Sequence, residues 1–154
     1  MGHASQSKDL SLDTVNERII EVLADNSRIS LKDLSREVGL SSPTVAERIK
    51  RLEDRGFIRR FTIEVDAQAL GYELQAIVRL KPTPGALLAV EKMIQDTPEF
   101  VECDKVTGDD CFVGRLYVRS MEHLDKILDQ LSDRAQTNTV IVKSTPVARR
   151  LPPL

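Results

Sequence analysis

The feature that most constrains this chain is a helix that must end and restart within three residues. Gly39 closes one short amphipathic segment, and Ser42 and Pro43 open the next. A glycine ends a helix at little steric cost because it adopts the left-handed conformation. Serine as N-cap followed by proline suits a first helical turn. We therefore predict a short helix over 30–38, a tight turn, and a second helix that begins at Ser42 and ends before Gly56.

A further amphipathic segment precedes this pair. Asp13 is suited to cap its start, and Ser30 with Asp33 forms a capping box at the start of the next helix. Apolar residues recur at helical spacing in all three segments. The predicted inward positions are Val15, Ile19, Val22 and Leu23, then Leu31, Leu34 and Val38, then Val45, Ile49 and Leu52. The pattern predicts three helices around one core, the last two forming a helix-turn-helix.

The second half reads strand, helix, strand, strand, helix, strand. The predicted strands are 75–81, 101–107, 111–118 and 140–148, and the predicted helices are 86–96 and 121–132. The helices turn inward Leu87, Val90 and Ile94, and Met121, Leu124, Ile127, Leu128 and Leu131. This order predicts a ferredoxin-like βαββαβ domain with both helices on one face of the sheet.

The segment between the two halves is rich in β-formers. Residues 57–65 predict a hairpin arm or wing, and 66–71 a single helical turn closed by glycine. The predicted organisation is α+β: a winged helix-turn-helix domain over 11–63, a linker over 64–73, and a ferredoxin-like domain over 74–154.

The predicted strands carry apolar residues at both odd and even positions, and therefore on both faces of the sheet. Ala76-Ile77-Val78, Phe112-Val113 and Val140-Ile141-Val142 leave apolar side chains on the face that the helices do not cover. A second copy of the chain is the simplest cover for that face. We therefore predict a homodimer formed by packing sheet on sheet.

Charge is distributed unevenly around a net charge of −2. Residues 28–63 carry nine basic and five acidic side chains, whereas residues 64–154 carry eleven and fourteen. A basic stretch beside an acidic remainder is typical of a DNA reader joined to another domain. No apolar run is long enough to cross a bilayer, and the first residues carry no apolar signal core. We expect a cytoplasmic, nucleoid-associated protein.

Catalytic and metal-binding signals are weak. His3 and His123 have no metal-ligand spacing, and nucleotide-loop and nucleophile-elbow motifs are absent. Cys103 and Cys111 are expected to be free thiols rather than a disulfide. We predict no cofactor, no metal and no enzymatic activity.

The second helix of the helix-turn-helix carries the candidate DNA contacts, because its first turns meet base edges in such motifs. Arg48 suits a bidentate contact to guanine, and the other cations suit phosphates. The candidates are Ser42, Pro43, Thr44, Glu47, Arg48, Lys50, Arg51, Arg55, Arg59 and Arg60. One alternative is a solvated helix face with charges paired one turn apart. A second is that the C-terminal domain is a metabolite-binding module and the helical domain docks a protein.

Three stretches carry a resemblance to a known family. Residues 12–19, 34–45 (LSREVGLSSPTV) and 48–58 (RIKRLEDRGFI) resemble the Lrp/AsnC, or feast/famine, transcriptional regulators. The resemblance implies sequence-specific DNA binding, a βαββαβ effector domain, and dimers that assemble into octamers or similar arrays.

The resemblance also implies an amino-acid site in the second half. Its loop is Gly108, Asp109, Asp110 and Cys111, and its second segment is Thr137, Asn138 and Thr139. Many family members have an aspartate where Cys111 stands, so the ammonium contact does not transfer directly. From the residues alone, a solvated hairpin tip and a threonine-rich strand entry stay open as alternatives. Leucine or methionine is the expected effector.

Overall fold

The computed structural model describes residues 12–154, so residue 11, the predicted domain start, lies outside it. The chain divides into two compact units. One contains residues up to 63 together with 147–154, and the other contains residues 64–146. The tail 147–154, which the sequence assigns to the second domain, is thus grouped with the first unit.

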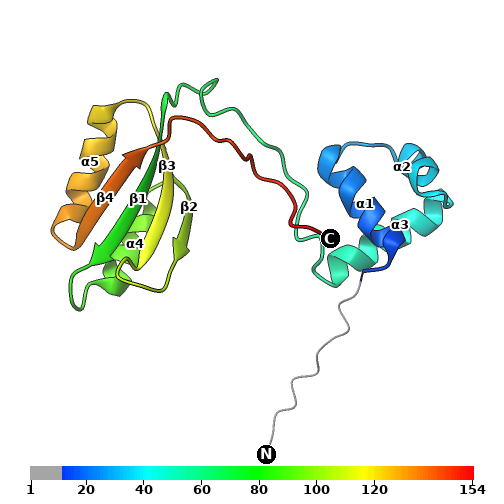
Figure 1. The fold of residues 1–154 in the computed structure, drawn as a ribbon, viewed down its shortest axis with the longest axis horizontal. Helices are drawn as coiled ribbons and strands as arrows, with labels where there is room; N and C mark the ends of the chain where they lie inside the picture. Colours follow the sequence, from blue (N-terminus) through cyan, green and yellow to red (C-terminus); the bar gives the residue numbers. More distant parts are fainter. Residues whose placement is uncertain (1–11) are drawn as a thin grey trace, which may run out of the picture. The chain divides into compact units, whose positions relative to one another are not determined.

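The first unit contains three helices: α1 (Thr14–Asp25), α2 (Leu31–Val38) and α3 (Ser42–Asp54) (Figure 1). Each contributes to one apolar core, and Ile20 joins it in addition to the predicted positions. The buried members are Ile19, Ile20, Leu23, Leu34, Val45 and Leu52. The helical periodicity of the sequence is therefore confirmed as a three-helix core.

The segment predicted as a hairpin arm or wing, residues 57–65, forms no β-hairpin. Within residues 12–154, no strand forms between Gly56 and Leu74. The chain folds back after α3, where the Ile58 N–H donates to the Leu52 carbonyl (3.1 Å), and then runs extended with Phe61 and Ile63 exposed. Its β-forming residues have no partner strand, and a strand needs one to be stable.

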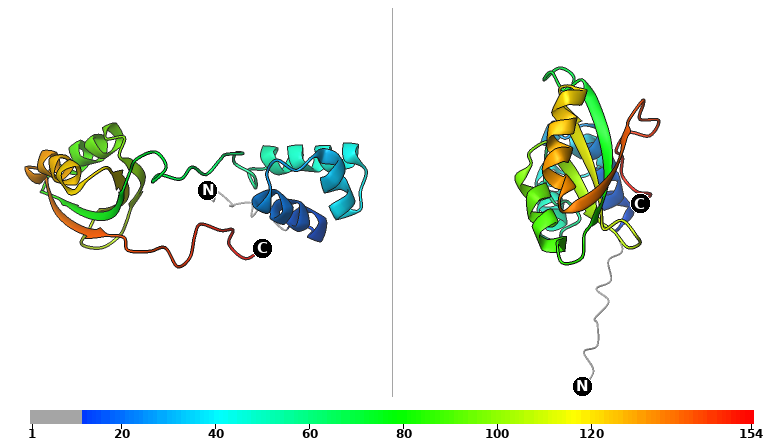
Figure 2. Two further views of the ribbon diagram at one scale, coloured as in Figure 1. Left: turned by 90° about the horizontal axis from the view of Figure 1, so that it is seen from above. Right: turned by 90° about the vertical axis from the view of Figure 1, so that its left-hand side faces the viewer.

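The second unit is a four-stranded antiparallel sheet with two helices. The strands are β1 (Leu74–Pro82), β2 (Phe100–Lys105), β3 (Phe112–Val118) and β4 (Ala135–Ile141), in the order β2-β3-β1-β4. The helices α4 (Leu87–Asp96) and α5 (Met121–Ser132) lie on the same face of the sheet (Figure 2). This arrangement confirms the predicted ferredoxin-like fold.

The last strand lies earlier than predicted, at Ala135–Ile141 instead of 140–148. The prediction placed this strand too close to the C-terminus because the apolar run at 140–142 is typical of a strand. Strand position is set by pairing with β1, where Ala135 faces Pro82 and Ile141 faces Ala76. The strand therefore begins almost directly after α5.

The face of the sheet without helices is less apolar than predicted. In β1, Ala76, Val78 and Leu80 are fully buried beneath the helices, whereas Arg79 between them is exposed. Alternation is therefore present, and the uncovered face mixes Ile77 with charged side chains.

Three apolar residues predicted to point inward are exposed. Leu31, Leu87 and Met121 have 40%, 36% and 51% of their surface accessible. Each is the first residue of its helix. A side chain at that position lies at the edge of the contact with the core, so helical spacing alone overestimates its burial.

Candidate DNA-binding and effector-binding surfaces

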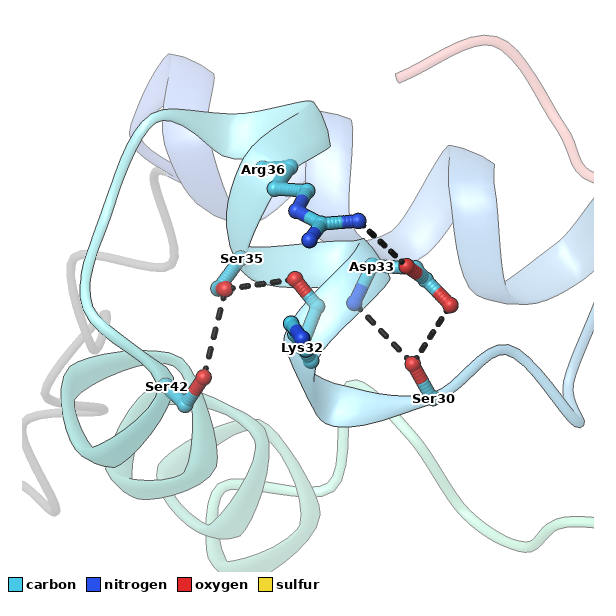
Figure 3. A network of polar contacts seen from close by, with 6 residues as sticks. All are labelled: Ser30, Lys32, Asp33, Ser35, Arg36 and Ser42. Atoms are coloured by element: carbon cyan, nitrogen blue, oxygen red, sulfur yellow. Dashed lines mark hydrogen bonds and ion pairs between the residues drawn. The ribbon is translucent and has the colours of Figure 1, made fainter.

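The turn between α2 and α3 has the backbone that the sequence indicates. Gly39 adopts φ +68°, in the left-handed region. Ser30 caps α2, with its Oγ accepting the Asp33 N–H (3.0 Å), as Figure 3 shows. The cap of α3 is Ser41 rather than the predicted Ser42, and its Oγ accepts the Thr44 N–H (3.4 Å). Local hydrogen bonds therefore fix where α2 and α3 each begin.

Ser42 uses its side chain inside the unit. Its Oγ donates to Ser35 Oγ (3.2 Å), and Ser35 Oγ donates to the Lys32 carbonyl (2.7 Å) (Figure 3). Ser35 is only 9% exposed, so this chain of hydroxyls lies between α2 and α3. Ser42 therefore holds the two helices together.

The rest of the predicted DNA face is largely accessible. Glu47 and Arg51 form an ion pair along α3, and the Arg55 guanidinium lies 5.5 Å from the centre of the Phe57 ring. The exposed members are Pro43, Thr44, Glu47, Lys50, Arg51, Arg55, Arg59 and Arg60. This surface is polar, with more cations than anions, as contact with a polyanion requires.

Arg48 differs from its neighbours because its guanidinium is held by α1. Its Nη1 donates to Asp13 Oδ2 (2.7 Å) and to Asn16 Oδ1 (3.1 Å), and 29% of its side chain is exposed. The hydrogen bond from Arg48, and then that from the Asn16 N–H, holds the pKa of Asp13 below its ordinary value. The sequence did not indicate this contact.

The predicted effector loop joins β2 to β3. Gly108 adopts φ +112°, and the Cys111 carbonyl accepts the Val106 N–H (2.8 Å). The Cys111 N–H donates to the Leu80 carbonyl (3.0 Å), which fixes the loop to β1. Asp109 is exposed, whereas Asp110 is half-buried with an oxygen 3.7 Å from the Arg79 guanidinium.

The second predicted segment lies inside β4 and not before it. Thr137 stands opposite Leu80, the residue that binds the loop, so the structure brings Thr137 and the loop to the same end of the sheet. Thr139 stands two residues further along, opposite Val78, and its buried Oγ1 has no hydrogen-bond partner among the described residues.

The cysteines are free thiols, as predicted. Burial, with smaller contributions from Asp104 and Glu91, raises the pKa of the Cys103 thiol. His123 hydrogen-bonds Glu99 (3.0 Å); His3 lies outside the described residues. Among residues 12–154, no group of acidic, cysteine or histidine side chains has the arrangement of a metal site.

Two surface hollows lie elsewhere in the second unit. One of about 510 Å³ is lined partly by Tyr72, Tyr117 and Lys143, and one of about 230 Å³ by Leu70, both tyrosines and Val101. Neither of these two hollows includes a predicted effector residue. In the described part of the chain, none of the helices has the length and apolar character to cross a bilayer.

The geometry defines a helix-turn-helix unit joined to a ferredoxin-like unit, and comparisons with known proteins identify both. Residues 12–59 match a family model described as winged helix-turn-helix DNA-binding, and residues 75–152 match the Lrp/AsnC ligand binding domain. The chain belongs to the Lrp/AsnC family of transcriptional regulators, as the sequence resemblance predicted.

Relatives cover most of the chain. The transcriptional regulator FL11 of Pyrococcus furiosus is 35% identical over 120 residues, which are 78% of this chain and 80% of FL11. The structure of Bacillus subtilis LrpC has a TM-score of 0.85 and 31% identity, covering 91% of this chain and 100% of LrpC. A Neisseria meningitidis regulator in complex with L-methionine has a TM-score of 0.86 and 25% identity, covering 92% and 97%.

Proposed function

We propose that this regulator reads duplex DNA with the exposed side of α3 and with the arm that follows it. The observation that carries the proposal is the turn from Gly39 to Ser41, which fixes the start of α3 while leaving its cationic side accessible. Direct contacts are assigned to Pro43, Thr44, Glu47, Lys50, Arg51, Arg55, Arg59 and Arg60. The nine basic against five acidic residues over 28–63 support this assignment.

The effector is an amino acid, with methionine or leucine as the candidates. The relative bound to L-methionine supports this assignment, as does the meeting of the 108–111 loop with Thr137 at one end of the sheet. Asp109 or Asp110 pairs with the ammonium group, and loop amides with Thr137 and Thr139 hold the carboxylate. Cys111 contributes an apolar wall.

The active form is a homodimer that assembles further, to an octamer or a similar array. The exposed Val140 and half-buried Ile77 on the uncovered sheet face support pairing through that face. Two copies then place two α3 helices about 34 Å apart, or a multiple of that, on a pseudo-palindromic operator. The effector acts only through different affinities for different assemblies. The protein works in the cytoplasm at the nucleoid and catalyses no reaction.

Selection from a random duplex library tests the DNA assignment. We expect the full chain to enrich one sequence and to bind it more tightly than a scrambled duplex of equal composition. Lys50→Ala should weaken both complexes equally and flatten the salt dependence, because it removes a phosphate contact. Failure to bind any duplex at low salt would refute the proposal and favour protein docking.

Calorimetric titration tests the effector assignment. We expect L-methionine or L-leucine to bind the full chain, and Asp109→Asn with Asp110→Asn to abolish binding. Asp129→Asn with Asp133→Asn, a double variant of two exposed acidic residues at the end of α5, serves as the charge-matched control. Unchanged binding by the double variant would remove the loop from the site.

A further inference from the structure

Arg48 lies on the helix that we assign to DNA, yet its guanidinium is engaged by another helix. Asp13 and Asn16, which accept its hydrogen bonds at 2.7 and 3.1 Å, precede it by 35 and 32 residues. Asp13 is the N-cap of α1, and Asn16 belongs to the first turn. The contact therefore ties the start of α1 to the middle of α3.

The guanidinium in this ion pair is less exposed than the guanidinium groups of Arg18, Arg36 and Arg51, which also form ion pairs in the same unit. Arg36–Asp33 and Arg51–Glu47 join residues on the same helix, and more than half of each side chain is exposed. The tertiary pair Arg18–Glu37 is 3.4 Å long, with 52% of both side chains exposed. By contrast, 29% of the Arg48 side chain is exposed, against 52% of the Asp13 side chain, and their ion pair measures 2.7 Å. Less solvent around a guanidinium strengthens its interaction with a carboxylate.

The Asp13 carboxylate is also held by a hydrogen bond that does not involve Arg48. Its Oδ1 accepts the Asn16 N–H (2.7 Å), which caps α1, and its Oδ2 faces Arg48. The lowered pKa of Asp13 keeps this carboxylate charged. Asp13 therefore joins a helix cap to a tertiary ion pair, and Arg48 Nη1 donates to two acceptors at the start of α1.

We propose that Asp13 and Asn16 are positioning residues for DNA recognition, which hold Arg48 as a strut that sets the angle of α3 on α1. This inference rests on the proposed contact of α3 with DNA. Arg48 then determines sequence specificity by orienting the helix, and base contacts come from its exposed neighbours.

The strut and the base reader respond oppositely to loss of the Asp13 charge. If Arg48 reads a base, Asp13→Asn frees its guanidinium and removes a negative charge near a polyanion, so binding tightens. If Arg48 is a strut, Asp13→Asn loosens α3, so affinity for the selected sequence falls while affinity for random DNA does not. Asparagine is a good N-cap, so α1 itself is preserved.

The test measures fluorescence anisotropy of the full chain with the duplex selected above and with its scrambled form. We expect Asp13→Asn and Arg48→Ala each to weaken binding to the selected duplex about tenfold, within the range of one lost specific contact, with the scrambled duplex unchanged. The double variant should be no weaker than Arg48→Ala, because the two residues act as one unit. The slope of affinity against salt should stay the same in all variants.

Glu17→Gln is the matched control, since it removes the same charge from the same turn of α1. It should bind both duplexes like the parent chain. Tighter or unchanged binding of the selected duplex by Asp13→Asn, or a double variant whose loss is the product of the single losses, would overturn the strut. If the parent chain selects no duplex, the proposed function fails instead, and a double-mutant cycle of unfolding between positions 13 and 48 still decides whether the strut exists.

Discussion

Gly114 in β3 is the position where one added methyl group most directly tests the packing of the second unit. A Cβ built there would lie 2.6 Å from Phe100 Cε1 and 3.6 Å from Cys103 Sγ. Non-bonded carbons prefer about 3.5–4.0 Å, so the phenyl ring must move by roughly 1 Å. Alanine at position 114 therefore displaces Phe100 and leaves the cysteine in ordinary contact.

The free-energy change follows from how easily that ring can move. Overpacking a core usually costs about 1–3 kcal/mol. Phe100 is half-buried, and the pairing of β2 with β3 is irregular between Phe100 and Glu102. Because an edge strand with a bulge yields more readily than a central strand, we expect Gly114→Ala to lower the free energy of unfolding by about 1–2 kcal/mol.

Urea unfolding followed by tyrosine fluorescence measures this change. The chain has two tyrosines, Tyr72 and Tyr117, and no tryptophan, so the signal comes from the second unit alone. The midpoint should fall while the slope stays constant. Phe100→Leu, which shortens the obstructing side chain, provides the partner variant. In its presence Gly114→Ala should cost less than about 0.5 kcal/mol, a coupling of roughly 1 kcal/mol. Equal costs in both backgrounds would refute the steric reasoning.

The other predictions concern the connector, a charged cap and a surface pair. Gly71→Ala should destabilise the second unit by about 1–3 kcal/mol, since φ is +82° and the new Cβ would lie 2.7 Å from Arg119 Nη1. Arg119→Ala should relieve part of that loss in the double variant, as urea midpoints can show. The ion pair of Asp13, whose pKa is lowered on folding, stabilises the first unit above its ordinary pKa of 3.8. Acid titration followed by circular dichroism should show that this contribution disappears as the pH falls through the lowered value, and Asp13→Asn should remove this pH dependence. Lys92→Ala breaks the ion pair with Asp96 (2.6 Å). Because both side chains are exposed, the free energy of unfolding should change by less than about 0.5 kcal/mol. A thermal shift equivalent to a larger change would show that the exposed pair contributes more than expected.

The features that the sequence predicts well are those decided by adjacent residues. Asp13 and Ser30 cap their helices and Gly39 takes the left-handed turn, because each depends on the chemistry of a few neighbours. The cap of α3 was wrong by one residue because two serines precede Pro43, and local propensity does not distinguish them.

The features that the sequence did not predict depend on distant partners. The position of β4 follows from pairing with β1, which the apolar run at 140–142 does not reveal. Arg48 meets Asp13 only after α1 and α3 have packed, 35 residues apart in the chain. The sequence holds one weak indication of this contact: a capping aspartate has a second carboxylate oxygen that the cap does not use and that can accept another hydrogen bond. The arm over 57–65 lacks a partner strand within the described chain, and its composition alone does not supply one.

Most polar side chains on the first turns of α3 already have protein partners: Ser41 with Thr44, Ser42 with Ser35, and Arg48 with Asp13. Few polar side chains on these turns therefore remain to contact base edges. Each good base contact discriminates between bases by about 1–3 kcal/mol. A genome offers about a million or more competing positions, which requires roughly 8 kcal/mol of discrimination. One copy of this helix therefore makes too few base contacts to select a single site in a genome. The remaining specificity has to come from several copies of the chain binding together, or from how readily the duplex deforms.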